Sequence, residues 1–139
     1  KYYEHLKHMI LAKGLDAHIR FLGTITRKEM TWCYRNCAAF LMTSRVEACP
    51  NTALEAIAHR CLCISTNCSP MPEILAESAQ YYRPGDSAAL GTCIENTLHL
   101  SATAQQKLRD SAGIRAAQFT WEECCEQTID ELEKAIARH

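Results

Sequence analysis

Residues 38–65 read AAFLMTSRVEACPNTALEAIAHRCLCIS, and this stretch decides the fold. The continuous apolar run Ala38–Met42 predicts a strand covered on both faces, and Cys61–Ser65 predicts a second buried strand. Between them, the residues from about Pro50 to His59 predict a helix. Two buried strands joined by one helix imply parallel pairing with a right-handed crossover. The stretch therefore predicts the centre of an α/β sheet.

The flanking sequence continues this alternation of helices and strands. Two further short strands are expected, at Ile19–Leu22 and at Gln80–Arg83. Thr26 with Glu29, and Thr120 with Glu123, have the spacing of capping boxes at helix starts. The other expected helices cover residues 1–13, 26–35, 73–76, 86–98, 103–117 and the segment from 120 onward. We therefore expect one α/β domain, a Rossmann-like parallel sheet flanked by helices on both faces.

Composition narrows the classes of function. The 139 residues include 47% hydrophobic and 22% charged residues, which is typical of a globular domain rather than a disordered tail. The formal net charge is -1 and no basic block occurs, so nucleic acid is not an expected partner. The apolar runs are too short to span a bilayer.

Nine cysteines stand out, but they suggest neither a disulfide framework nor a zinc site. Their number is odd, and paired C-x-x-C knuckles are missing. Most lie in apolar stretches, where a free thiol behaves as a small hydrophobic side chain. We expect reduced, structural cysteines in a cytosolic protein. A redox or metal protein built on these cysteines is the weakest alternative.

Ligands of doubly wound sheets bind at the carboxyl ends of the strands, which here are followed by four segments. These segments are Gly23–Thr26, Ser44–Asn51, Thr66–Pro72 and Pro84–Asp86. The second segment, Ser44–Asn51, contains Glu47 in a loop. Glu55 follows in the second turn of the next helix. If that helix begins at Pro50, the N–H groups of residues 51–53 are free to hold an anion such as a diphosphate. The two carboxylates could then accept hydrogen bonds from sugar hydroxyls.

The same residues also have a purely structural interpretation. Thr52 and Glu55 fit an S/T-x-x-E capping box, so Glu55 could simply cap its own helix. Glu47 could be a solvated loop residue. The spacing alone leaves the two interpretations open.

Several segments in order resemble retaining GT-B glycosyltransferases of the large family-four group. The resemblance covers nearly the whole chain and includes the run from Ser44 to Ala56. The other matching segments are Arg20–Gly23, Tyr34–Ala38, Met71–Ile74, Arg83–Asp86 and Phe119–Glu122. The resemblance implies the C-terminal, nucleotide-sugar-binding domain of a GT-B fold.

The resemblance also implies roles for individual residues. Glu47 would lie beside the donor sugar as the catalytic residue, and the amides of Ala48 and Cys49 would reach the same sugar. The amides of Asn51 and Thr52 would hold the diphosphate. Glu55 would bind the ribose hydroxyls, and the backbone near Ile25 would meet the base. The reaction would retain the anomeric configuration, with a nucleotide diphosphate sugar as donor substrate and without a metal or any other cofactor.

The sequence departs from the family at several positions. Pro50, Arg60 and Leu62 stand where many relatives have glycine, glycine and proline. The resemblance further implies that residues 1–139 lack the domain's first two strands, whose cationic segment normally clamps the diphosphate, and that the N-terminal acceptor domain is absent. In the usual order of strands across the sheet, the missing strands would lie between Ile19–Leu22 and Ala38–Met42. The chain is therefore expected to be an excerpt of a longer protein. Alone, it would be inactive, and a second copy would fill the gap by self-association.

The expected function is therefore the donor half of a glycosyltransferase, with an unidentified acceptor and a missing N-terminal domain as partners. Its relatives suggest polysaccharide biosynthesis by a cytoplasmic enzyme, in solution or in peripheral contact with the inner face of the membrane. The main alternative is a catalytically silent nucleotide-sugar-binding or interaction module of the same fold. A nicotinamide-linked Rossmann domain is disfavoured because the chain has no G-x-G-x-x-G turn.

Overall fold

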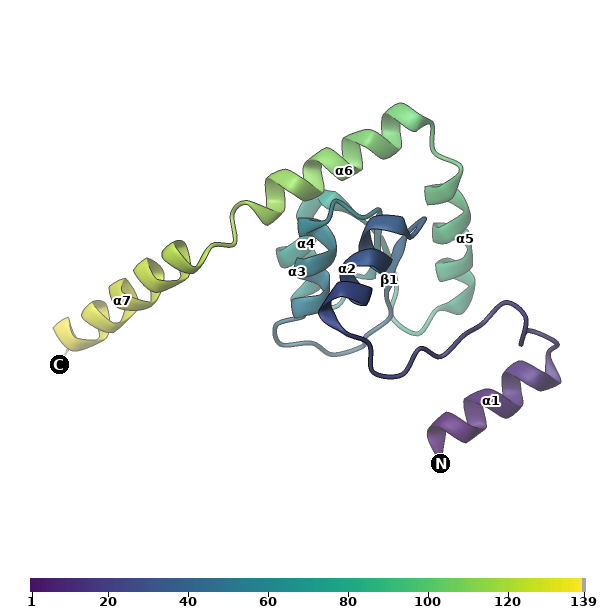
Figure 1. The fold of residues 1–139 in the computed structure, drawn as a ribbon. Helices are drawn as coiled ribbons and strands as arrows, with labels where there is room; N and C mark the ends of the chain where they lie inside the picture. The colour runs from purple at the N-terminus through teal and green to yellow at the C-terminus, as the bar shows by residue number, and fades with distance from the viewer. Residues whose placement is uncertain (139) are drawn as a thin grey trace. The chain divides into compact units, whose positions relative to one another are not determined.

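The computed structural model describes residues 1–138 and contains two compact units, Lys1–Met30 and the chain from Thr31 onward. Its elements are labelled in Figure 1. In chain order they are α1 (Tyr2–Ala12), α2 (Arg27–Asn36), β1 (Phe40–Met42), α3 (Asn51–Ala58), β2 (Cys63–Thr66), α4 (Met71–Leu75), the 3-10 turn η1 (Ala76–Ser78), β3 (Ala79–Tyr82), α5 (Ser87–Leu98), α6 (Ala102–Ala116) and α7 (Trp121–Ala137).

The first unit consists of α1 and the segment that follows it. As expected, α1 stops just before Gly14, whose φ of +63° is a left-handed conformation that glycine adopts without strain. The ring of Tyr3 packs edge-on against Phe21, with 5.0 Å between the centroids. The predicted strand Ile19–Leu22 is wrong, because no described residue pairs with it. A strand needs a neighbour to take up its backbone hydrogen bonds, and alternating side chains alone do not provide one.

The second unit is built around a parallel sheet in the order β1-β2-β3. Leu41 of β1 is in register with Ile64 of β2, which is in register with Gln80 of β3. Figure 1 shows α3 and α4 on one side of these strands and α5 on the other. All four residues of β2 are buried, as the apolar run in the sequence predicted. The α/β class and the parallel pairing are therefore confirmed. The expectation that Ala38–Met42 is covered on both faces is wrong, because β1 forms one edge of the sheet and Leu41 is 44% exposed.

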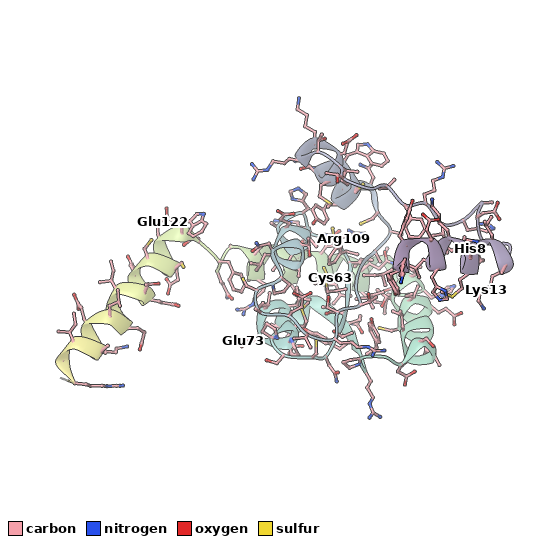
Figure 2. All side chains as sticks on the ribbon, turned by 90° about the horizontal axis from the view of Figure 1, so that it is seen from below. His8, Lys13, Cys63, Glu73, Arg109 and Glu122 are labelled. Carbon is pink, nitrogen blue, oxygen red and sulfur yellow. The ribbon has the colours of Figure 1, made fainter. Side chains whose placement is uncertain are left out.

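Apolar residues in and just before β2, together with residues of the preceding helix α3 and the following helix α4, form the core. Leu62 and Ile64 are at most 1% exposed, and Ile57 of α3 and Met71 and Leu75 of α4 are completely buried. Figure 2 shows Cys63 inside this unit, among side chains from the surrounding elements. The core thus fixes β2 and the helices on either side of it in the chain, and these elements carry the loops at the carboxyl edge of the sheet.

Side-chain caps begin most of the longer helices. The box at Thr26 is complete, because Glu29 Oε2 accepts from the Thr26 amide at 2.7 Å while Thr26 Oγ1 accepts from the Glu29 amide at 3.3 Å. The Thr26 amide holds the pKa of Glu29 below its usual value. Thr120 caps α7 through the Glu123 amide, but Glu123 does not complete the box, because its carboxylate accepts from Gln127 instead.

Hydrogen bonds and an ion pair that involve three arginines hold helix α6 against the rest of the second unit. Arg109 donates to the Arg60 carbonyl oxygen at 2.9 Å, and Arg60 lies 3.4 Å from Asp110. Arg115 donates to the Ile74 carbonyl oxygen at 2.9 Å and also to that of Glu73. These contacts tie α6 to the ends of α3 and α4.

Helix α7 forms as the capping signal predicted, but it has no buried residue. In Figure 2, Glu122 lies near its beginning and the side chains of α7 point outward on all sides. Within residues 1–138, none of the helices has the length and apolar character that a bilayer-crossing segment requires.

All nine cysteines are free, but they are less buried than the sequence suggested. Only Cys61 and Cys63 are buried, while Cys49, Cys124 and Cys125 are exposed. Burial is the main cause that raises the pKa of Cys63 from 9.0 to about 12. The prediction of small hydrophobic thiols therefore holds for the start of β2 and fails for the exposed positions.

The buried thiol of Cys63 should make the protein less stable as the pH rises into the alkaline range. Its folded pKa of about 12 is above the unfolded value of 9.0, so its contribution is complete below pH 9 and is lost as the pH rises toward 12. We expect the free energy of unfolding, measured in urea from pH 8 to 10.5, to fall less steeply in Cys63→Ala. The exposed Cys124→Ala is the matched control and should keep the wild-type slope. Equal slopes in all three proteins would contradict the assignment.

Candidate functional site

Three loops meet at the carboxyl edge of the sheet. They follow β1, β2 and β3, and hydrogen bonds join the first loop to the end of β2 and the second loop to the end of β3. Thr66 Oγ1 donates to the Ser44 carbonyl oxygen at 2.8 Å, and the Asn67 amide donates to the Tyr82 carbonyl oxygen at 3.0 Å. The Arg45 guanidinium lies over Gly85, with Nη2 3.4 Å from the point where a Cβ would stand. The structure thus brings together three of the four segments expected from the sequence.

The fourth predicted segment, Gly23–Thr26, belongs to the first unit. No strand precedes it. Ile25, the residue expected near the base, is half-buried within that unit. The proposed role of Ile25 stays a prediction.

The loop between β1 and α3 carries the first candidate carboxylate. Glu47 is half-buried, and no described residue forms a hydrogen bond or an ion pair with its carboxylate. Ala48 and Cys49, which follow it, are exposed. The loop therefore presents a carboxylate and two accessible residues directly before the first turn of α3.

The beginning of α3 differs from the expectation of three free amides. Pro50 is the N-cap rather than the first helical residue, and its ψ of 86° is not helical. The Asn51 amide donates to the Cys49 carbonyl oxygen at 3.0 Å, and the Ala53 amide donates to that of Pro50 at 2.9 Å. Among the described residues only the Thr52 amide of this set has no acceptor. The other two amides are hydrogen-bonded to nearby carbonyl oxygens, because the chain enters the helix through a tight turn.

Glu55 is not a helix cap. The beginning of α3 has no side-chain cap, so the Thr52–Glu55 capping box is wrong. Instead, Glu55 Oε2 accepts a hydrogen bond of 3.0 Å from the hydroxyl of Tyr34, which lies 21 residues earlier on α2. Tyr34 is 5% exposed, whereas Glu55 is exposed. A buried donor thus holds an exposed carboxylate in the second turn of α3.

A broad cleft of about 1380 Å³ opens beside α3. Cys49, Asn51 and Glu55 line one wall, and the opposite side is formed by the end of α6 and by α7. Glu47, Ala48 and Thr52 do not line it. The cleft therefore meets the candidate site only along one border, and we define the site by the three loops and the start of α3.

Within residues 1–138 no group of three or more His, Cys, Asp or Glu side chains is placed to hold a metal ion. The positive charge at the carboxyl edge of the sheet comes from Arg45, in the loop after β1, and from Arg83, which directly follows β3; both are exposed. The sequence interpretation did not assign a role to Tyr34 or Arg45. Both residues lie in segments that match the family pattern, and this match could have drawn attention to them. Their contacts, to Glu55 and Gly85, are distant in sequence and could not be predicted from it.

Comparison with known proteins agrees with this architecture. The chain is 26% identical over 116 residues to O-antigen chain mannosyltransferase B of Escherichia coli, and the match covers 83% of this chain and 30% of the relative. The fold resembles sucrose-phosphate synthase from Thermosynechococcus elongatus, with a TM-score of 0.81, 20% identity, and coverage of 98% of this chain and 35% of the synthase.

It also resembles the C-terminal domain of a glycosyl transferase group 1 family protein from Francisella tularensis, with a TM-score of 0.73 and 24% identity. That match covers 84% of this chain and 61% of the solved chain. The protein thus spans about a third of the mannosyltransferase and of the synthase. The family model described as glycosyl transferases group 1 matches residues 1–118, and the chain belongs to this family.

Proposed function

We propose that this chain is the donor-binding part of a retaining glycosyltransferase that moves a sugar from a nucleotide diphosphate sugar. The observation that carries the proposal is the placement of Glu47 in the β1–α3 loop and of Glu55 in the second turn of α3, beside the edge where the loops after β1, β2 and β3 meet. Ligands of doubly wound sheets bind at this edge. Membership of the glycosyl transferase family gives the chemistry that such a site would perform.

In this proposal the two carboxylates recognise different parts of the donor. Glu47, without a partner among the described residues, accepts hydrogen bonds from the hydroxyls of the transferred sugar, and the amides of the exposed residues Ala48 and Cys49, next in the chain, reach the same sugar. Glu55 accepts from the ribose hydroxyls. The backbone near Ile25 meets the base. Hydrogen bonds to a charged acceptor are strong enough to select the donor.

The diphosphate would be held by backbone amides and by positive charge. The Thr52 amide has no acceptor among residues 1–138 and could serve this purpose, and the Asn51 amide becomes available if it leaves the Cys49 carbonyl oxygen, which is 3.0 Å away. The first turn of α3 adds the positive end of the helix dipole. Arg45 supplies a cation at the same edge. These groups would stabilise the departing diphosphate without a metal ion.

We further propose that the chain works within a longer protein whose N-terminal domain binds the acceptor. The mannosyltransferase relative is more than three times as long as the matched region, since the match covers 30% of it. That relative's name, an O-antigen chain mannosyltransferase, suggests synthesis of a surface polysaccharide. The enzyme would act in the cytoplasm or at the inner face of the membrane.

A second candidate is a module that binds nucleotide sugars but does not transfer them. The occupied Asn51 and Ala53 amides favour this candidate, because they reduce the number of free donors for a diphosphate at the start of α3. The two candidates differ in turnover and not in the ligand that they bind.

The donor site is tested with nucleotides that share the diphosphate and differ in the base. We would measure thermal unfolding of the chain with UDP, GDP, ADP, UDP-glucose and GDP-mannose, with NAD for comparison. A ligand at a hundred times its Kd stabilises the folded state by about 2.7 kcal/mol. Glu55→Ala is expected to weaken binding by roughly tenfold, which halves this stabilisation.

Glu95→Ala is the matched control, since Glu95 is an exposed glutamate of α5. It should bind the nucleotide like the wild type. If a cooperatively folded sample responds to none of these nucleotides, the donor-site proposal is overturned. If binding occurs but the longer protein transfers no sugar, the silent module is the correct function.

A further inference from the structure

Tyr34 connects the core to the candidate site. It lies on α2, is 5% exposed, and its ring packs edge-on against Phe40 and His59, with centroid distances of 5.9 Å and 5.4 Å. Its hydroxyl is 3.0 Å from Glu55 Oε2 and 3.4 Å from the Thr52 carbonyl oxygen. The ring is thus fixed by packing, and its polar end lies against the first turns of α3.

The backbone of Tyr34 is held as well. Its carbonyl oxygen accepts from Cys61 Sγ at 3.1 Å and from Cys37 Sγ at 3.5 Å. Cys61 is buried directly before β2. Tyr34 is therefore anchored at its main chain by the core of the sheet and at its side chain by neighbouring rings, which leaves its hydroxyl little freedom to move.

The hydroxyl acts as a hydrogen-bond donor to Glu55. Burial, followed by the nearby Glu55 carboxylate, raises the pKa of Tyr34, so the phenol stays protonated at neutral pH. A phenol has one proton to give, and a carboxylate is a stronger acceptor than a carbonyl oxygen. The shorter of the two distances, to Glu55, agrees with this preference.

Glu55 would be mobile without this contact. A glutamate on the exposed face of a helix loses considerable side-chain entropy when it is fixed for a ligand. The Tyr34 bond fixes Oε2 before any ligand arrives, while Oε1 has no hydrogen-bond partner among the described residues. A pre-ordered acceptor binds a hydroxyl more tightly than a freely rotating one.

We propose that Tyr34 is a positioning residue that holds Glu55 and thereby makes the site prefer ribonucleotides over deoxyribonucleotides. This inference rests on the proposed function, in which Glu55 binds the ribose. A ligand that lacks a ribose hydroxyl leaves the fixed carboxylate without its partner, and a site built to bind a hydroxyl rejects such an analogue. A freely moving Glu55 would discriminate much less.

The test compares the Kd of UDP, GDP and ADP with those of the corresponding 2′-deoxynucleotides by titration calorimetry. We expect the wild type to prefer the ribonucleotide of its base by about tenfold. Tyr34→Phe keeps the ring and should reduce this preference to roughly twofold by weakening only the ribonucleotide. Tyr81→Phe is the matched control, because its partly buried hydroxyl donates to the Ala76 carbonyl oxygen at 2.8 Å; it should keep the preference.

Glu55→Asp gives a second test that leaves Tyr34 in place. Aspartate keeps the charge at an exposed position but is one methylene too short to retain the Tyr34 contact, so the preference should fall as in Tyr34→Phe. An unchanged preference in either variant, or equal weakening of both ligand forms in Tyr34→Phe, overturns the positioning role. If the wild type binds nucleotides without any preference for the ribose form, the positioning role of Tyr34 is overturned while the donor site stands. The absence of binding by all six nucleotides overturns the donor site as well.

Discussion

Glu47→Gln is expected to lower the rate of sugar transfer by about a hundredfold, because the variant loses the charge that accepts hydrogen bonds from the sugar in the transition state. The substitution keeps the size of the side chain and removes only its charge. Glu47 is half-buried and has no partner among the described residues, so folding should be unaffected. The measurement is kcat/KM for transfer by the longer protein that we propose carries this chain, with the donor identified in the nucleotide panel.

Nucleotide diphosphates without the sugar provide the internal comparison for Glu47. Their Kd should stay within about twofold of the wild-type value, since Glu47 is proposed to contact only the sugar. Glu77→Gln is the matched control, because this exposed glutamate precedes β3 and so lies at the opposite edge of the sheet. A rate close to that of the wild type in Glu47→Gln would remove Glu47 from the proposed catalytic machinery.

The parts of the fold that follow from local signals were predictable. The apolar run before Ser65 gave a buried central strand because a strand covered on both faces has no polar side. The caps at Thr26 and Thr120 begin helices because their side chains accept from amides three residues later. Such features depend on residues that are close in sequence, and their positions agree with the structure to within about two residues.

Features that depend on distant partners were not predictable. Ile19–Leu22 has the alternation of a strand, but no described segment pairs with it. Glu55 has the spacing of a capping residue, yet its carboxylate bonds to Tyr34 of another helix. In both cases the local pattern fits two structures, and only the tertiary neighbours decide between them.

Arg60 is a departure from the family pattern that only the structure explains. Its φ of 55° is left-handed, a conformation that glycine adopts more easily, and the resemblance described above implies glycine at this position. The turn after α3 is thus formed here by a strained residue. Arg60 also lies across Gly113 of α6, where an added Cβ would come within 2.8 Å of its Nε atom.

Ile64→Ala is expected to reduce the free energy of unfolding by about 3 kcal/mol, because it removes buried methyl groups and leaves a cavity. Ile64 is 0% exposed and lies in the middle strand, paired on both sides with Leu41 and Gln80. The measurement is urea unfolding followed by circular dichroism, with an unchanged m-value as evidence that only stability has altered. Since β2 precedes the loop that contacts Ser44, the same loss should lower the temperature at which nucleotide binding disappears.

Leu41→Ala is the control for Ile64, because both residues share one register of the sheet and differ in burial. Leu41 is 44% exposed on the edge strand β1, so its truncation should cost less than about 1 kcal/mol. A small effect at Ile64 together with a large one at Leu41 would mean that the exposed edge of β1 is covered in solution. That outcome would match a protein in which another strand pairs with β1, whereas the expected order of effects places the main core around β2.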